Sequence, residues 1–441
     1  MPKKKMMTLI LVLCLCLLTG CAFSQPAEEL YRLPKLPAEY ESLEQRIDEM
    51  LSNGAEYAAP TAGSHLQSVQ MIDLDGNGTE EAIAFFRKST DEKPMKICLY
   101  RENDNAYEQF ALIEGTASSL YSVEYSDLDG DGLSELLIAY KSGTGLQVLS
   151  VYSLANDTPT ALLTSLYNRY TLFDADGDAR RELAVFYGDE SGRCGVDCYT
   201  FGGEVQRLAA LPLSFAVSEL RAVESGRLAD GENALFVTGV SDGSVAVTDI
   251  LTLYEENGHK TLRRVGDALG EMFWFLELYP TDMNGDGITE VPDGVVFPSD
   301  DLEGESYYRI DWRQYAADGT SAVVHRSFRN SADGWQIALK EDWDGIITLR
   351  RKTSSEENSV TFLLVQESGE LLPFMSVYTI TGETREVRAT RGNRFALARQ
   401  VDTVYAAEFF EANTLVPNAM DETSLRESFS LLVSDWTNED N

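Results

Sequence analysis

Four nine-residue segments of the sequence place oxygen-bearing side chains at alternate positions. Each segment has Asp at the first position, Asp or Asn at the third and fifth, and Glu at the ninth. In chain order, loops 1 to 4 are Asp73–Glu81, Asp127–Glu135, Asp174–Glu182 and Asp282–Glu290. Oxygens spaced in this way converge on one point of a tight loop, and glycines permit the turn. The pattern indicates binding of a hard cation such as Ca²⁺.

The predicted ligands are the side chains at positions one, three, five and nine and the backbone carbonyl at position seven. They are Asp73, Asp75, Asn77, Thr79 and Glu81; Asp127, Asp129, Asp131, Leu133 and Glu135; Asp174, Asp176, Asp178, Arg180 and Glu182; Asp282, Asn284, Asp286, Ile288 and Glu290. The alternative for each loop is a solvated Asp-Gly turn that joins two strands.

The four loops differ in ligand charge. Loop 2 is the strongest candidate because its four side-chain ligands are all carboxylates, which repel one another unless a cation lies between them. Amides replace a carboxylate at Asn77 and Asn284, and Ala179 replaces the second glycine of loop 3. We therefore expect the turn of loop 3 to be harder to form and its site to be weaker.

The interval between loops 3 and 4 is about twice that between loops 1 and 2. This spacing predicts a hidden copy of the repeat in the gap, where Glu224–Glu232 keeps the closing acid but lacks oxygen ligands at positions three and five. We expect this copy to form a blade and to bind no ion.

Strand-like runs flank the loops, for example Ser68–Ile72 before loop 1 and Ala82–Phe86 after it. Two further runs precede the next loop, so each repeat of about 50 residues holds four strands, as the blade of a β-propeller does. In an EF-hand the closing Glu is at position twelve and helices flank the loop, so these loops belong to a different class.

These loops between strands resemble the calcium loops of FG-GAP and VCBS repeats, as in the β-propeller of integrin α-subunits. The resemblance covers about residues 73 to 325. It implies a mainly β fold, a β-propeller of about five to seven four-stranded blades, with Ca²⁺ as the bound ion. It implies a fold and an ion more firmly than an activity, because one fold carries many functions.

The N-terminus has the layout of a secretory signal peptide at residues 1–20, with three Lys before a short apolar run. The run is shorter than the ~20 residues that span a bilayer. Leu18–Cys21 resembles the lipobox of bacterial lipoproteins, although an ordinary signal with a buried cysteine is the alternative. We predict that Cys21 is lipidated and holds the protein at the extracytoplasmic face of the bacterial cell membrane.

The rest of the chain divides into four segments. Residues 21–37 contain three prolines and are expected to be a linker, and residues 38–54 have the apolar spacing of an amphipathic helix. We assign the β-propeller to residues 55–327 and a small α+β domain to residues 328–441. The alternative for this last segment is one or two further blades.

The C-terminal segment contains strand-like runs and one predicted helix. The helix would begin after the capping residues Asp421 and Thr423 and carry Leu425, Phe429, Leu432 and Trp436 at helical spacing. Trp335 and Trp343 could form a shelf on which a sugar stacks, but aromatic residues beside strands usually belong to the core, and we expect the core.

Composition excludes several classes of function. The chain has 36 Lys and Arg against 72 Asp and Glu, a net charge of −36 that repels a phosphate backbone, so nucleic acid is not an expected partner. The three histidines, in unrelated contexts, leave little material for Ser-His-Asp or multi-His zinc chemistry. We expect Cys98, Cys194 and Cys198 to be packed thiols.

The sequence favours a lipid-anchored, calcium-binding β-propeller that acts as a binding or adhesion module for an extracellular protein or glycan. Two alternatives stay open: a propeller enzyme, such as a calcium-assisted polysaccharide lyase or lactonase, and a structural scaffold of the cell envelope. No isolated catalytic pair stands out, because every repeated acid is already assigned to a metal loop or a turn. This favours binding over catalysis.

Overall fold

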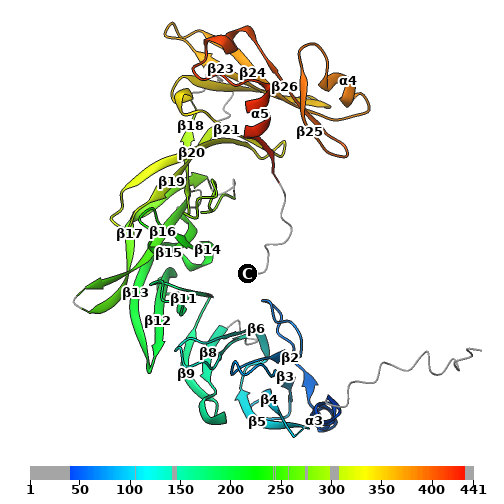
Figure 1. The fold of residues 1–441 in the computed structure, drawn as a ribbon, viewed down its shortest axis with the longest axis vertical. Helices are drawn as coiled ribbons and strands as arrows, with labels where there is room; N and C mark the ends of the chain where they lie inside the picture. Colours follow the sequence, from blue (N-terminus) through cyan, green and yellow to red (C-terminus); the bar gives the residue numbers. More distant parts are fainter. Residues whose placement is uncertain are drawn as a thin grey trace, which may run out of the picture.

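The computed structural model describes residues 40–432, apart from 105, 142–146, 242, 244, 257, 274–276 and 298–306. In this part of the chain, six antiparallel sheets of four or five strands follow one another along an arc (Figure 1). The predicted mainly β fold is confirmed, and six blades lie within the range expected for the β-propeller. Among the described strands, no sheet joins the two ends of the arc.

Sheets 1 to 3 come from the first half of the chain, and their strands pair in chain order, except that β1 and β2 both pair with β3. Sheet 1 contains β1 (Glu56–Tyr57), β2 (Val69–Ile72), β3 (Glu81–Arg87), β4 (Met95–Asn103) and β5 (Ala106–Gly115). Sheet 2 contains β6 (Ser119–Ser126), β7 (Glu135–Lys141), β8 (Gln147–Ser153) and β9 (Thr160–Leu166). Sheet 3 contains β10 (Arg169–Phe173), β11 (Glu182–Gly188), β12 (Arg193–Gly202) and β13 (Glu204–Ala216).

Sheets 4 to 6 complete the arc. Sheet 4 contains β14 (Leu220–Arg227), β15 (Asn233–Ser241), β16 (Val245–Glu256) and β17 (His259–Phe273). Sheet 5 contains β18 (Val291–Val296), β19 (Tyr308–Tyr315), β20 (Ser321–Asn330), β21 (Trp335–Ala338) and β27 (Phe429–Leu431). Sheet 6 contains β22 (Ile347–Lys352), β23 (Glu357–Val365), β24 (Leu371–Ile380), β26 (Val404–Phe409) and, at its edge, β25 (Phe395–Arg399).

The strands β3, β7, β11 and β15 are apolar on both faces, because a neighbouring sheet or, on one side of sheet 1, a helix covers each face. In β7, Leu136 and Ile138 pack toward sheet 1, whereas Leu137 and Ala139 pack toward sheet 3. Successive strand residues point to opposite faces, so a strand between two neighbours reads as a continuous apolar run. This explains why the runs after the metal loops do not alternate.

Short helices cover the two ends of the arc. The helix α3 (Glu41–Ser52) packs Leu43 and Ile47 against Ala84 and Phe86 of β3. It lies within the predicted range of residues 38–54, and its C-terminal cap is Asn53. At the other end, α4 (Arg385–Ala389) packs on sheet 6. The exposed faces of the first and last sheets are thereby partly buried.

The C-terminal segment differs from its prediction in one helix. The helix α5 (Glu422–Ser428) begins at Asp421, whose side chain accepts a hydrogen bond from the N–H of Ser424. The predicted helix is wrong beyond Ser428, because residues Phe429–Leu431 instead form β27 and pair with β21. An open sheet edge offered backbone hydrogen bonds that a further helical turn does not supply. The domain boundary drawn at residue 327 falls inside β20.

Both candidate sugar-stacking tryptophans belong to the core, as expected. Trp335 and Trp343 are almost completely buried in the cluster between sheets 5 and 6. The three described cysteines are also buried and free, which agrees with their prediction as packed thiols. Burial raises the pKa of the Cys98 thiol to about 11 and that of Cys194 to about 12, so both are protonated at neutral pH.

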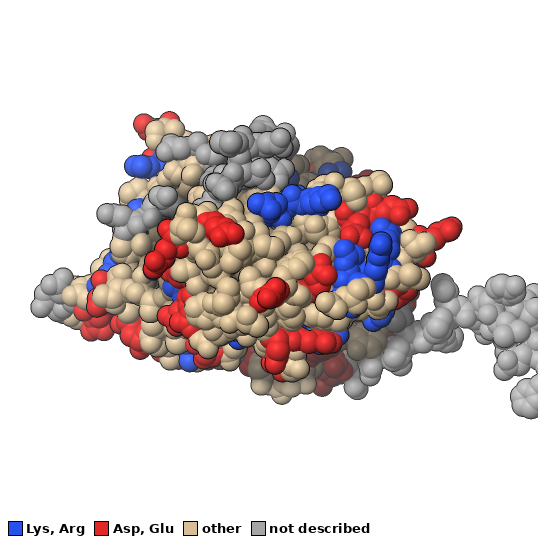
Figure 2. Space-filling model, turned by 90° about the horizontal axis from the view of Figure 1, so that it is seen from above, with Lys and Arg blue, Asp and Glu red and all other residues tan. Residues whose placement is uncertain are grey.

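The signal segment, Cys21 and the whole predicted linker lie outside the described residues, as does Trp436. None of the helices in the described chain is both long enough and apolar enough to pass through a bilayer. Figure 2 looks along the long axis toward the C-terminal end of the arc. Asp and Glu are spread over that face, and Lys and Arg lie among them in small groups.

Candidate metal centres

Each of the four predicted loops lies at a turn directly before a strand, namely β3, β7, β11 or β18. Loops 1, 2 and 3 join β2 to β3, β6 to β7 and β10 to β11. Loop 4 leads into β18 and is closed by an isolated bridge between Thr281 and Glu290. The structure therefore places the loops between strands, as the sequence predicted.

The backbone of each loop is held by its own side chains in one repeated pattern. The Oδ2 of the first Asp accepts a hydrogen bond from the N–H of position six, at 2.8–3.1 Å. The position-five side chain accepts one from the N–H of position seven, at 2.7–2.9 Å. These bonds fix the predicted carbonyl ligands, which are Thr79, Leu133, Arg180 and Ile288.

The closing glutamates are the most buried part of each loop. Glu81, Glu135 and Glu290 are completely buried, and Glu182 is 4% exposed. In every loop one carboxylate oxygen, Oε2, accepts a hydrogen bond from the N–H of position two at 2.7–2.9 Å. The other oxygen, Oε1, is left for a second partner, and that partner differs between loops.

Three carboxylates gather in each loop, with one oxygen from each lying within 4.8 Å of the others. The groups are Asp73, Asp75 and Glu81; Asp127, Asp129 and Glu135; Asp174, Asp176 and Glu182; Asp282, Asp286 and Glu290. The predicted ligands Asp131 and Asp178 are not members of these groups. Convergence of three acidic oxygens suits a divalent cation with oxygen ligands.

Strand register decides what faces the Oε1 atom of each closing glutamate. The pairing of Ala82 with Tyr100 continues by one residue to bring Glu81 opposite Arg101, whose Nε donates to Oε1 at 2.9 Å. By the same rule Glu182 meets Thr200, at 3.4 Å, and Glu290 meets Gln314, at 2.8 Å. Cross-strand neighbours share one face of a sheet, which is why these side chains meet.

Loop 2 departs from this rule. The register places Ser153 opposite Glu135, but the Ser153 hydroxyl accepts a hydrogen bond from the N–H of Ala155 instead. The Oε1 atom of Glu135 is buried and has no hydrogen-bond partner among the described residues. A buried carboxylate oxygen without a partner is costly when ionised, by several kcal/mol in order of magnitude. The carboxylates of loop 2 therefore have no positively charged partner among the described residues.

In loop 1, a side chain supplies the positive charge. Arg101 donates to Glu81 and to Asp157, each at 2.9 Å, and lies 3.7 Å from Asp75. The guanidinium therefore places a positive charge beside Asp75 and Glu81, two of the three gathered acids. The Oδ1 atom of Asp73 remains buried without a partner, so this neutralisation is incomplete.

Loops 3 and 4 also contain partners from the protein. Lys260 of β17 forms an ion pair with Asp176, and Arg180 pairs with Asp178. In loop 4 the amide of Gln314 donates to both Asp286 and Glu290, at 2.8 Å each. Neither Lys260 nor Gln314 could be recognised from the repeat pattern, because each lies on a strand distant from its loop in sequence.

The pKa values follow these differences. Desolvation raises the pKa of Glu135 to about 7, and the neighbouring aspartates add to the shift. Burial likewise raises the pKa of Asp129, Glu182 and Glu290. By contrast, the hydrogen bond from Arg180 lowers the pKa of Asp178. Loop 2 therefore holds acids that are destabilised as anions, as expected where a cation has yet to be supplied.

The residues of loop 2 fit a calcium ion. Asp127, Asp129 and Glu135 offer converging oxygens. Among the described residues, no donor reaches Glu135 Oε1, and no Lys or Arg forms an ion pair with the loop. A hard divalent cation is the partner that such a donor set prefers. Loops 1 and 3 fit less well, because their own cations already pair with the same acids.

The turn of loop 3 is strained at Ala179, as the sequence predicted. Its φ is 70°, a conformation that glycine adopts easily but a residue with a Cβ does not. The matching glycines have similar angles, 88° at Gly78, 88° at Gly132 and 81° at Gly287. Loop 3 therefore has the same backbone geometry as the other three loops, but with strain at Ala179.

The hidden repeat forms a blade, as expected. Glu224–Glu232 runs from β14 into the turn before β15 of sheet 4. The acids of this turn serve the protein itself: Asp230 accepts from the N–H of Ala317 at 2.8 Å, and Glu232 accepts from Thr252 at 3.3 Å. In this loop, the remaining acids accept hydrogen bonds from the protein and do not form a set of converging ligands.

All four loops also form hydrogen bonds between neighbouring sheets. The N–H of Ser134 in loop 2 donates to the carbonyl of Leu74 in loop 1 at 2.7 Å. The N–H of Thr289 in loop 4 donates to the carbonyl of Arg227 at 2.9 Å. Asn233 of β15 donates to the carbonyl of Asp174 in loop 3 at 2.8 Å. The shape of each loop thereby influences how one sheet sits on the next.

Comparison with known proteins identifies no family for this chain. No family model and no curated protein matches the sequence. Among solved structures, a complex of the Aleuria aurantia lectin with α-methyl-L-fucoside is 11% identical, with a TM-score of 0.23, and the match covers 72% of this chain and 93% of the lectin. The WD40 domain of SCAP from fission yeast is 10% identical, with a TM-score of 0.23, and the match covers 80% and 97% of the two chains.

A fungal lectin described as a six-bladed β-propeller gives a TM-score of 0.22 at 10% identity, with 70% of this chain and 91% of the lectin covered. These TM-scores are low, so the likenesses identify no ligand for this chain. The description of the fold rests on the strand pairing within its six sheets.

Proposed function

We propose that this protein is a calcium-stabilised binding module for a ligand outside the cell. The observation that supports the ion most strongly is the buried Oε1 of Glu135, which lies among converging carboxylates and has no hydrogen-bond partner in the described chain. A Ca²⁺ ion would supply the positive charge that this oxygen lacks. The resemblance of the loops to FG-GAP and VCBS repeats agrees with this proposal.

The role of the ion would be structural. Asp127 and Glu135 already anchor the backbone of loop 2 through bonds to Gly132 and Leu128. Loop 2 in turn contacts loop 1 through Ser134 and Leu74, so a fixed loop 2 would hold sheets 1 and 2 at a fixed angle. Calcium sites of extracellular modules are often weak, with Kd of about 10⁻⁴ to 10⁻³ M, which suits permanent occupancy in a calcium-rich medium.

Binding is favoured over catalysis because the gathered acids hold loops together. Each has backbone or side-chain hydrogen bonds within its own loop. We further propose that lipidation of Cys21 holds the module at the extracytoplasmic face of the membrane. The ligand would be an extracellular glycan or protein.

The test is capture of ligand with and without calcium. Purified protein is applied to a glycan array and, separately, used to capture proteins from a cell-envelope extract, in Ca²⁺ or in chelator. We expect capture in Ca²⁺ and weaker capture in chelator, because sheets 1 and 2 lose their fixed arrangement.

The matched variants are Glu135→Gln and Glu232→Gln, which change the ninth position in loop 2 and in the decayed loop. Only Glu135→Gln should reduce the calcium dependence. Absence of capture on both surfaces would contradict the binding role. Equal capture in Ca²⁺ and in chelator, for the wild type and both variants, would contradict the role of the ion.

A further inference from the structure

A cavity lies between sheets 1 and 2, away from the metal loops. Its walls are the end of β5 with the residues that follow it, and the face of sheet 2 formed by β7, β8 and β9. Its volume is about 360 Å³. Pockets for small ligands in proteins span roughly 300–1,000 Å³, so this cavity has room for a small molecule rather than a few waters.

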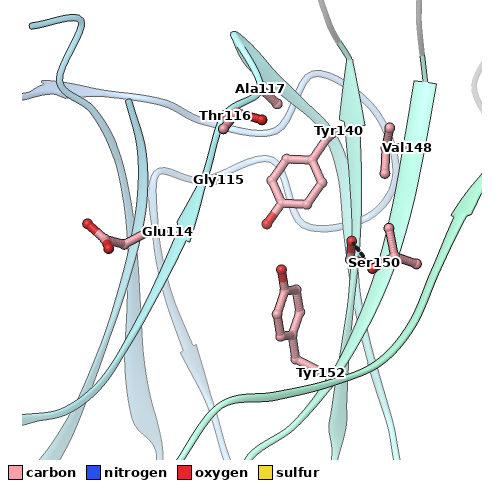
Figure 3. Close-up of a pocket in the computed structure, with 9 residues that line it drawn as sticks. Glu114, Gly115, Thr116, Ala117, Tyr140, Val148, Ser150 and Tyr152 are labelled. Carbon is pink, nitrogen blue, oxygen red and sulfur yellow. Dashed lines mark hydrogen bonds between the residues drawn. The ribbon is translucent and has the colours of Figure 1, made fainter. Parts of the chain in front are cut away.

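Hydroxyl groups converge on this cavity. Figure 3 shows Tyr140 of β7 and Tyr152 of β8 with their hydroxyl groups pointing toward one another. The Tyr140 side chain is only 6% exposed, and its hydroxyl has no hydrogen-bond partner among the described residues. A buried hydroxyl without a partner is unfavourable, so its presence beside a cavity indicates that a ligand could supply the partner.

A second hydroxyl pair lies on the same wall. Ser150 of β8 and Thr164 of β9 are 3.2 Å apart, and Figure 3 shows Ser150 beside the two tyrosines. Ser150 is 4% exposed. Because a hydroxyl both donates and accepts, this pair can turn one of its bonds toward a bound group. The cavity therefore offers several hydrogen-bonding groups without a formal charge.

The remaining walls are apolar or backbone. Val148 and Ala117 belong to the core that packs sheet 1 on sheet 2. Gly115 brings the backbone of β5 close to the Tyr140 ring, since a Cβ there would lie 3.4 Å from the ring. Flat aromatic and aliphatic surfaces beside hydroxyls suit a ligand with both C–H faces and polar edges.

The cavity lacks the charge that would select an ion. Glu114 is the charged residue among the described lining residues, and Figure 3 shows it pointing away from the tyrosine pair. Its carboxylate forms an ion pair with Lys96. Burial raises the pKa of Tyr140, so its phenol stays neutral. An anionic group would find no cation here, and a cationic group would find no facing carboxylate.

We infer that this cavity binds one neutral sugar unit of a glycan, through the hydroxyls of Tyr140, Tyr152 and Ser150 and the surface of the two aromatic rings. The inference rests on the proposed binding function and names its site. A sugar ring carries hydroxyls on its edge and C–H groups on its faces, which matches this lining. A purely apolar ligand would leave the Tyr140 hydroxyl without a partner.

The experiment measures binding of a panel of neutral monosaccharides to the intact protein by saturation-transfer NMR and calorimetry, guided by the glycan array. Tyr152→Phe removes one hydroxyl and keeps the ring, so we expect affinity to fall about tenfold, as for one lost hydrogen bond of roughly 1.4 kcal/mol. Ala117→Leu fills the cavity and should abolish binding. Tyr254→Phe, on a tyrosine of sheet 4 far along the chain, is the matched control and should bind normally.

Melting curves establish that each variant is folded, and Tyr140→Phe gives a second hydroxyl deletion should Ala117→Leu fail to fold. Sugar binding that is unchanged in Tyr152→Phe and Tyr140→Phe overturns the assignment of the site while the binding function stands. A wild-type protein that captures an envelope protein but no neutral sugar also overturns it and leaves that function intact. A wild-type protein that captures neither overturns both.

Discussion

Loops 1 and 2 have similar backbone hydrogen bonds, but they differ in the residue that faces the closing Glu. Both hold their first Asp and closing Glu in the same hydrogen bonds, and both gather three carboxylates. On β4, Arg101 faces Glu81, whereas no donor from the described residues reaches Oε1 of Glu135. We propose that the residue across the sheet, and not the loop motif alone, decides whether a loop needs a metal ion.

The largest expected effect separates loop 2 from the rest of the chain. At calcium about 100 times its Kd, ion binding to the folded state should raise the free energy of unfolding by about 2.7 kcal/mol per site. Chelator should therefore lower the melting temperature of the wild type. In the double variant Asp127→Ala with Asp129→Ala, most of this difference should disappear.

The control for that experiment is Glu232→Gln in the decayed loop, which should melt with the full calcium response. Melting curves of the wild type that coincide in calcium and in chelator would contradict the need of loop 2 for an ion.

Removal of the internal cation should make loop 1 resemble loop 2. Arg101→Met leaves the buried Glu81 without its ion pair, a change that costs about 3–5 kcal/mol at fully buried sites. Because Arg101 is 35% exposed, we expect a smaller loss of about 2 kcal/mol in chelator. Calcium should restore part of this loss, so the variant gains calcium response, as measured by denaturant unfolding. A variant equally unstable with and without calcium would break the comparison.

A smaller effect is expected from relieving the strain of loop 3. Ala179→Gly removes the Cβ from a residue with φ of 70°. The free energy of unfolding should rise by about 1 kcal/mol, reduced somewhat by the greater freedom of glycine in the unfolded chain. The measurement is denaturant unfolding in chelator, with Ala175→Gly in the same loop as the control that should not stabilise.

The smallest effect is expected at Lys260. Its ammonium pairs with Asp176 but is 42% exposed, so solvent screens the interaction. Lys260→Met should change the free energy of unfolding by less than about 1 kcal/mol in chelator. It should, however, raise the affinity of loop 3 for calcium, because the competing cation is gone. Unchanged calcium affinity would show that Lys260 does not act in place of an ion.

The sequence was a good guide to the repeated parts of the molecule. The spacing of the loops predicted the blades, including the one at Glu224–Glu232 that has no intact motif. It also predicted the strain at Ala179, since position six requires a positive φ in every copy. These features depend on residues close together in the chain, where spacing and local geometry are directly linked.

Features that depend on register were not accessible from the sequence. Arg101 meets Glu81 only because the hairpin between β3 and β4 has a particular length, and Lys260 reaches loop 3 from sheet 4. The predicted C-terminal helix failed at Phe429 for a similar reason, since the open edge of β21 competes for that segment. Apolar spacing at 425, 429 and 432 does not reveal a distant strand edge.

The most direct test of the central claim is calorimetric titration of the purified, calcium-free protein with Ca²⁺, beside the Glu135→Gln variant. If loop 2 is the dominant site, the wild type should show a saturable heat that the variant largely loses, while Glu232→Gln keeps it. A wild type that releases or absorbs no heat, or a Glu135→Gln variant that titrates like the wild type, would contradict the account.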